Sequence, residues 1–107
     1  MVIIMKQKRY HYRAKTILPV VIDDLFYGTI LEISAGGVLL RTDFPLRNRL
    51  VLLDVRMPNH HLKAFGLVVR EVNSNVYGVE FLSLLPREKA MISQFIFRFC
   101  VRKEVDF

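Results

Sequence analysis

The sequence predicts a mainly β protein, a six-stranded antiparallel barrel with one C-terminal α-helix. Short apolar runs with alternating side chains follow one another between turn residues, as in the strands of a small barrel. The alternation stops after Leu82, and from Pro86 onward apolar residues recur at spacings of three and four, as in an amphipathic helix. The 107 residues are enough for a single domain with its own core.

The first three strands are expected at residues 16–22, 26–33 and 37–42. In the first, Pro19 suits an edge or bulge position because proline has no backbone donor. Asp23-Asp24-Leu25 is typical of the turn that follows it. Strict alternation in the second strand places two sets of side chains on opposite faces: Tyr27, Thr29, Leu31 and Ile33 against Gly28, Ile30, Glu32 and Ser34.

The other strands are expected at residues 50–56, 62–72 and 76–82, and the helix at about 86–103. Gly66 lies in the middle of the longest strand, where a barrel corner or a bulge needs a residue without a side chain. We therefore divide the chain into a basic N-terminal arm, residues 1–14, and a barrel with its helix, residues 15–107.

The arm carries much of the formal net charge of +6. Five cations precede the first acidic residue, Asp23: Lys6, Lys8, Arg9, Arg13 and Lys15. Such a segment attracts anions, and it is equally typical of a solvated chain start or of a nucleic-acid-binding arm. Because no basic stripe continues it on a predicted face, nucleic acid is not the favoured partner.

The sequence lacks the residue patterns that a disulfide, a metal site, catalysis or a membrane span would require. The single Cys100 cannot form an internal disulfide or a cysteine metal cage, and His60-His61 follows turn residues rather than lying at helical metal-ligand spacing. We expect no metal, no cofactor and no enzyme activity, since no nucleophile and base can be placed on one element. No apolar run reaches the ~20 residues of a membrane span, so a cytoplasmic protein is expected.

Two short patterns are candidates for ligand binding. Glu32 and Ser34 precede Gly36-Gly37, and together they offer acceptors for the donor edge of a purine beside an open backbone. The same Ser-x-Gly-Gly pattern is also typical of an ordinary hairpin turn. Arg9 and Arg13 have the spacing Arg-x-x-x-Arg, which lets two guanidinium groups reach phosphate oxygens or the acceptor edge of guanine. A guanine nucleotide would match both patterns.

These residues resemble the motifs of the PilZ family of bacterial cyclic di-GMP receptors. Arg9-Tyr-His-Tyr-Arg13 is similar to its Arg-x-x-x-Arg motif, and Glu32-Ile-Ser34-Ala-Gly-Gly37 to its Asp/Asn-x-Ser-x-x-Gly motif. Gly78-Val79-Glu80-Phe81 is similar to the strand before the family's final helix. Glu32 departs from the family's Asp or Asn, and its longer side chain can accept from guanine or pair with Arg9 or Arg13.

The resemblance implies a cyclic di-GMP-binding receptor or adaptor. Arg9 and Arg13 would hold phosphate and the guanine acceptor edge, Glu32 and Ser34 would read the donor edge, and Gly37 would allow close backbone approach. Lys8, directly before the first motif, would favour two intercalated ligands per protomer. Binding would order the arm and change the surface offered to a protein target in motility, pilus or exopolysaccharide machinery, or to a kinase. The alternative is an adaptor that Glu32 prevents from binding the nucleotide.

The closing helix has a second apolar face. Its main stripe comprises Met91, Ile92, Phe95, Ile96, Phe99 and Cys100. Phe97 and Val101 fall almost opposite this stripe, and one helix cannot turn both faces into one barrel. We expect a homodimer or a partner to use this face, unless the tail at residues 105–107 covers it.

Overall fold

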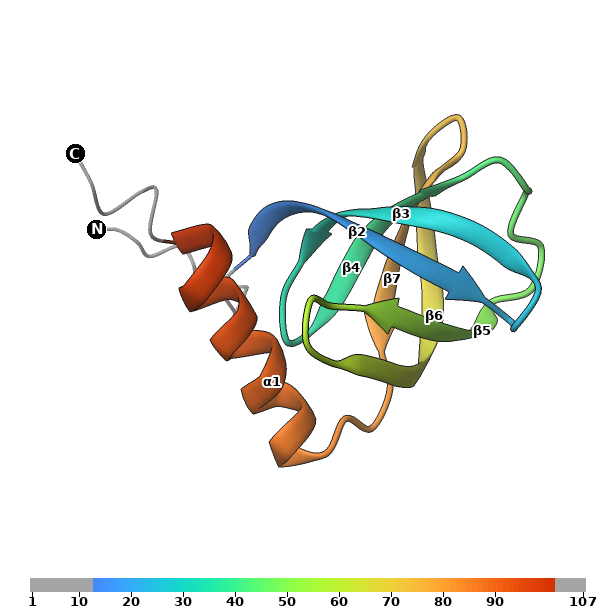
Figure 1. Cartoon of the computed structure of the whole chain (residues 1–107). Coiled ribbons are helices and arrows are strands. Elements are labelled where there is room, and N and C mark those ends of the chain that lie inside the picture. Colours follow the sequence, from blue (N-terminus) through green and yellow to red (C-terminus); the bar gives the residue numbers. More distant parts are fainter. Residues whose placement is uncertain (1–12, 102–107) are drawn as a thin grey trace.

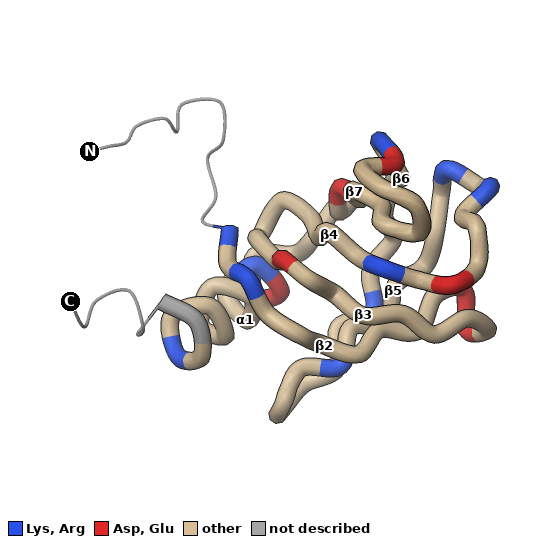
Figure 2. Tube along the Cα trace, turned by 90° about the horizontal axis from the view of Figure 1, so that it is seen from above, with Lys and Arg blue, Asp and Glu red and all other residues tan. Residues whose placement is uncertain are grey.

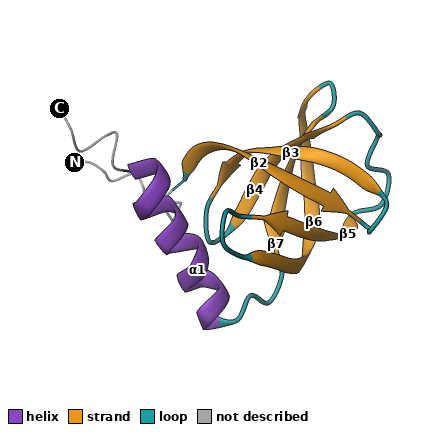
Figure 3. Ribbon diagram, in the orientation of Figure 1, coloured by secondary structure: helices purple, strands orange, loops and turns teal. Residues whose placement is uncertain are grey.

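The computed structural model describes residues 13–101, with side chains up to residue 99. Six strands precede one helix (Figures 1 and 3), which confirms the predicted fold class. The elements are β2 (Ala14–Ile22), β3 (Phe26–Ile33), β4 (Gly37–Thr42), β5 (Leu50–Arg56), β6 (His61–Asn73), β7 (Val76–Phe81) and α1 (Pro86–Ile96). β3, β4 and β5 have the predicted bounds, and the other strand ends differ by at most two residues.

The strands form a closed antiparallel barrel in the order β2, β3, β4, β7, β6, β5. Closure leaves no long free sheet edge, since β2 at one end of the order pairs with β5 at the other. That pairing covers only Val20 to Ile22 of β2. Pro19 lies just outside it, which agrees with the edge position expected of a residue without an amide hydrogen.

The barrel interior is filled by alternating apolar side chains, and α1 lies along one end of the barrel (Figure 1). Ile92, Phe95 and Ile96 of α1 are buried and join the barrel core. Pro86 occupies the first turn of α1, and the Glu88 carboxylate accepts a hydrogen bond from the Leu85 amide at 2.8 Å. The predicted stripe is therefore confirmed for these three residues and for the partly buried Met91, whereas Phe99 is 48% exposed and the side chain of Cys100 lies outside the described part.

The helix does not run as one α-helix through the expected range. α1 ends at Ile96, and one π-helical turn, Phe97–Val101, follows. A π turn has i to i+5 hydrogen bonds and so more residues per turn than an α-helix, which rotates later residues away from ideal α-helical positions. The remainder of the predicted helix lies outside the described residues.

The predicted faces of β3 were wrong beyond Ile30. Both Ile30 and Ile33 are fully buried, although strict alternation places them on opposite faces. The cause is a β-bulge, because the β3–β4 register shifts between Ile30 and Glu32. One extra residue in a strand reverses the alternation after it. Glu32 consequently lies on the outer face of the barrel.

The turns agree with the predicted turn chemistry. Asp23 and Asp24 both have positive φ angles, 56° and 57°, and the Leu25 amide donates to the Ile22 carbonyl at 3.0 Å. This is the geometry of a type I′ hairpin turn, which aspartate tolerates. Asn75, with φ of 68°, lies in the turn between β6 and β7.

Candidate ligand site on the barrel surface

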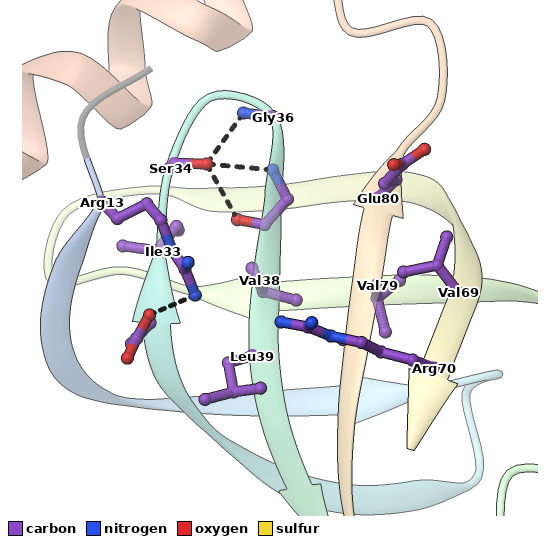
Figure 4. Close-up of a pocket in the computed structure, with 13 residues that line it drawn as sticks. Arg13, Ile33, Ser34, Gly36, Val38, Leu39, Val69, Arg70, Val79 and Glu80 are labelled. Atoms are coloured by element: carbon purple, nitrogen blue, oxygen red, sulfur yellow. Dashed lines mark hydrogen bonds and ion pairs between the residues drawn. The ribbon is translucent and has the colours of Figure 1, made fainter. Parts of the chain in front are cut away.

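A cavity of about 570 Å³ lies on the outer face of the barrel, over β3, β4, β7 and β6. Figure 4 shows that its walls come from segments far apart in the sequence: the start of β2, the turn between β3 and β4, and the bulged part of β6. Its volume is in the range of small-molecule sites. The predicted site residues Arg13, Glu32, Ser34 and Gly37 all line it.

The floor of the cavity is a row of paired residues that crosses the sheet. Glu32 of β3 is opposite Leu39 of β4, Leu39 is opposite Gly78 of β7, and Gly78 is opposite Arg70 of β6. Neighbouring strands are ~4.8 Å apart, so the two outer members are separated by about three strand spacings. The row brings an acidic group and a basic group to opposite sides of the cavity.

The Arg13 guanidinium is bound to the Glu32 carboxylate, with Nη2 2.5 Å from Oε1. Arg13 precedes β2, and Lys15, two residues later, pairs with Glu32 across the two strands. Figure 2 shows basic positions at the beginning of β2 beside an acidic position on β3. Both side chains keep contact with solvent, at 34% and 25% exposure. The pair therefore lies at the mouth of the cavity, where an entering ligand can compete for either group.

Ser34 organises the turn between β3 and β4. Its hydroxyl oxygen accepts from the amides of Gly36 at 3.0 Å and Gly37 at 3.2 Å (Figure 4). The backbones of Ser34 and Gly37 also exchange two hydrogen bonds, of 2.9 and 3.3 Å. Two amide donors use both lone pairs of the hydroxyl. Ser34 thus stabilises an ordinary hairpin turn, as the alternative interpretation of the pattern requires. Direct contact of Ser34 with a ligand stays a prediction.

Gly37 is needed for the packing of β4 against β7. A Cβ at this position would lie 2.2 Å from the carbonyl oxygen of Val79. Backbone atoms of a paired strand cannot move away without loss of the pairing, so any other residue would strain it. Neither Gly36 nor Gly37 uses a positive φ angle. The glycine is explained by this close strand contact, and the predicted approach of a ligand is untested.

Several cavity residues were not predicted as site residues, among them Arg70, Glu80 and Leu39. Glu80 belongs to the Gly-Val-Glu-Phe segment, and it is exposed on β7 opposite Gly37. Arg70 follows a bulge in β6, where the pairing with β7 shifts between Val68 and Arg70. Sequence patterns carry no sign of this shift. Lys8 and Arg9, which were predicted as ligand contacts, lie outside the described residues.

No group of histidine, cysteine and acidic residues within residues 13–101 has the arrangement of a metal site. The same part of the chain contains no helix with the length and apolar character needed to cross a membrane. The polar groups that line the cavity are guanidinium, carboxylate, hydroxyl and backbone groups, which suit ligand recognition by hydrogen bonds and charge.

The sequence matches the PilZ domain family over residues 6–98. The chain belongs to this PilZ domain family. The matched range contains both arginines of the first motif and the whole barrel. PilZ domains are receptor and adaptor domains rather than enzymes.

A solved structure of the same fold is the Bacillus subtilis inhibitor of motility, MotI/DgrA. The two structures superpose with a TM-score of 0.74 at 19% sequence identity. The superposition covers 94% of this chain and 52% of that one, so the chain spans about half the length of that protein. At this identity the likeness shows the fold alone. No curated protein matches the sequence.

Proposed function

We propose that this PilZ domain is a receptor for cyclic di-GMP that acts in the cytoplasm and passes the signal to a protein target. One observation carries the proposal. The residues in both family motifs that fall within residues 13–101, namely Arg13, Glu32, Ser34 and Gly37, line one cavity of ligand size. They come from the segment before β2, from β3, from the turn after it and from β4, and their convergence supports a shared ligand.

The charge of the cavity supports a role for the arm. Its described walls contain two arginines, Arg13 and Arg70, and two glutamates, Glu32 and Glu80, which sum to a net charge of zero. Cyclic di-GMP carries two phosphodiester charges, and a neutral cavity offers them no net attraction. Arg9 and Lys8 of the arm would supply the missing positive charge when the ligand draws the arm over the cavity. Arginine is suited to this because its planar group binds phosphate or guanine with two hydrogen bonds.

Binding would require an exchange at Arg13. In the ligand-free state its guanidinium is bound to Glu32. A phosphate or the guanine acceptor edge would take over Arg13, and the released Glu32 carboxylate would accept from the guanine imide and amino groups. Glu32 would thus be a competitor before binding and a ligand contact afterwards. The net gain is smaller than for a free arginine, because the Arg13–Glu32 contact is lost when the two ligand contacts form.

The signal would leave the domain through the arm. Cyclic di-GMP would order the segment before β2 and so change the surface at that end of the barrel. A target in motility, pilus or exopolysaccharide machinery, or a kinase, would bind the changed surface. The motility inhibitor that shares the fold makes the motility machinery the first target to test.

A second function is favoured by the same ion pair. If the Arg13–Glu32 contact persists, the mouth of the cavity stays occupied by protein groups and the domain is an adaptor that works by protein contacts alone. The two functions differ in one measurable property, which is the affinity for the nucleotide.

Isothermal titration calorimetry of the full chain with cyclic di-GMP tests the proposal. Saturable heat at micromolar or lower ligand concentration, with far weaker heat from cyclic di-AMP, is the expected result, because adenine lacks the O6 acceptor. Absence of saturable heat with cyclic di-GMP would contradict the receptor function and leave the adaptor function standing.

A further inference from the structure

Arg70 is exposed, but its stem lies along the barrel surface beside Gly78. A Cβ placed on Gly78 would be 3.3 Å from both Cγ and Nε of Arg70. The arginine stem therefore crosses β7 over Gly78, which has no side chain in its way. Figure 4 shows its guanidinium reaching across β7 toward Leu39, inside the cavity.

The backbone sets this direction. The β6–β7 register shifts between Val68 and Arg70, and a bulge re-aims the side chains that follow it. Arg70 comes to lie directly opposite Gly78, on the same outer face as Leu39 and Glu32. Two features of separate strands, the bulge and the glycine, thus combine to hold one cation over the cavity floor.

The charge of Arg70 is not used within the described part of the chain. The ion pairs there join Arg13 to Glu32, Arg56 to Asp54 and Lys63 to Asp24. A guanidinium has five donors in a planar fork and no acceptor, so its partners must be oxygen or nitrogen acceptors. The cavity beside it is the space in which such a partner fits.

We propose that Arg70 is a ligand-binding residue of this site, and that Gly78 positions it. The proposal rests on the proposed function, because its ligand is cyclic di-GMP. Arg13 holds the ligand from the β2 side, and Arg70 donates to phosphate oxygens or to the guanine acceptor edge from the β6 side. The two arginines face each other across Leu39 and Gly78. The site therefore has a cation that neither family motif supplies.

Calorimetry with cyclic di-GMP on full-chain variants tests this. Arg70→Ala should weaken binding by about tenfold to a hundredfold, the usual worth of a hydrogen bond to a charged group. Arg70→Lys should recover only part of the loss, because an ammonium lacks the planar fork. Arg41→Ala is the matched control: Arg41 is exposed on the outer face of β4 two residues beyond Leu39, but it does not line the cavity.

The positioning role of Gly78 is tested by combining Gly78→Ala with Arg70→Ala. Gly78→Ala should weaken binding in the wild-type background, because the new methyl group displaces the arginine stem. In the Arg70→Ala background the same change should have no further effect, so the two losses are not additive. A merely structural role of Gly78 would give the same loss in both backgrounds and would overturn the positioning role.

The outcomes separate the two proposals. If the unchanged chain binds cyclic di-GMP and Arg70→Ala binds it equally well, the role of Arg70 is overturned while the receptor function stands. If the unchanged chain gives no binding, both are overturned. Thermal melting of each variant in the absence of ligand shows that the fold is intact, as expected for a side chain on the outer surface.

Discussion

Arg13 and Glu32 bind each other across the first two strands of the barrel, with 2.5 Å between Nη2 and Oε1. The last residue of one family motif is thus held by the first residue of the other. Both are predicted ligand contacts. In the ligand-free protein, each of these two groups therefore binds the other in place of a ligand group.

The first prediction concerns the length of Glu32. Glu32→Asp shortens the carboxylate and Glu32→Asn also removes its charge, so both should loosen the pair and tighten cyclic di-GMP binding. A tenfold gain corresponds to about 1.4 kcal/mol. Calorimetry measures the gain, and Glu32→Gln, which keeps the length without the charge, separates the two causes. Weaker binding by both Asp and Asn variants would mean that the site is adapted to glutamate.

The second prediction concerns Arg13. Arg13→Ala should abolish measurable binding of cyclic di-GMP, because a motif arginine that lines the cavity is removed. The melting temperature of the ligand-free protein should barely change, since ion pairs between partly exposed groups contribute little to stability. Arg87→Ala, at an exposed position in α1, is the control. A variant that binds like the wild type would rule out a clamp built on Arg13.

The third prediction separates the packing role of Gly37 from a ligand role. Gly37→Ala should destabilise the ligand-free protein by about 1–3 kcal/mol, the usual cost of overpacking, because the new Cβ meets the Val79 carbonyl oxygen. Thermal melting should show a fall of several degrees. Gly78→Ala is the matched control, since its methyl group meets a flexible side chain instead. Equal melting temperatures for the two variants would contradict the packing role.

The strand bounds were predictable because the signals are local. Alternation, β-branched residues and turn residues such as Asp23-Asp24 lie within a few positions of the structure that they specify. The faces of β3 were not, because a bulge depends on how two strands pair. Ile33 was assigned to the wrong face for this reason, and Glu32 lies on the outer face although strict alternation placed it with the buried Ile30.

Of the site, only the residues that belong to the two family motifs were predictable from the sequence. Arg13, Glu32, Ser34 and Gly37 carry family patterns, and they converge in one cavity. Arg70 has no such pattern. Its place in the cavity results from a register shift in β6 and from Gly78 in the neighbouring strand β7. The sequence of neither strand alone predicts how the two strands pair.

The fourth prediction concerns stoichiometry. Lys8 directly precedes Arg9, and a basic residue there is associated in the family with two intercalated ligands. We expect calorimetry to give two cyclic di-GMP molecules per protomer. Lys8→Leu should reduce this to one, because an intercalated pair brings four phosphate charges together and needs the extra cation. A ratio of one for the unchanged chain would refute the prediction.

The fifth prediction concerns the second apolar face of the closing helix. Phe97 is 71% exposed, as expected from its position opposite the buried stripe, and Ser93, Gln94 and Arg98 surround it with polar groups. The side chain of Val101, the other predicted member of this face, lies outside the described residues. An exposed aromatic ring with a polar rim is typical of an interaction surface. Two copies related by a two-fold axis would cover each other's Phe97.

Analytical ultracentrifugation of wild type and Phe97→Glu at matched concentrations tests this face. The wild type should sediment as a dimer and the variant as a monomer, because two carboxylates facing each other across the axis repel. Leu25→Glu is the control, since Leu25 is 67% exposed in the turn between β2 and β3, at the end of β2 far from the helix (Figure 1), and the same charge there should leave the dimer intact. If wild type and Phe97→Glu sediment alike, Phe97 is not part of a self-association surface. Equal loss of the dimer in both variants would instead point to the added negative charge as the cause.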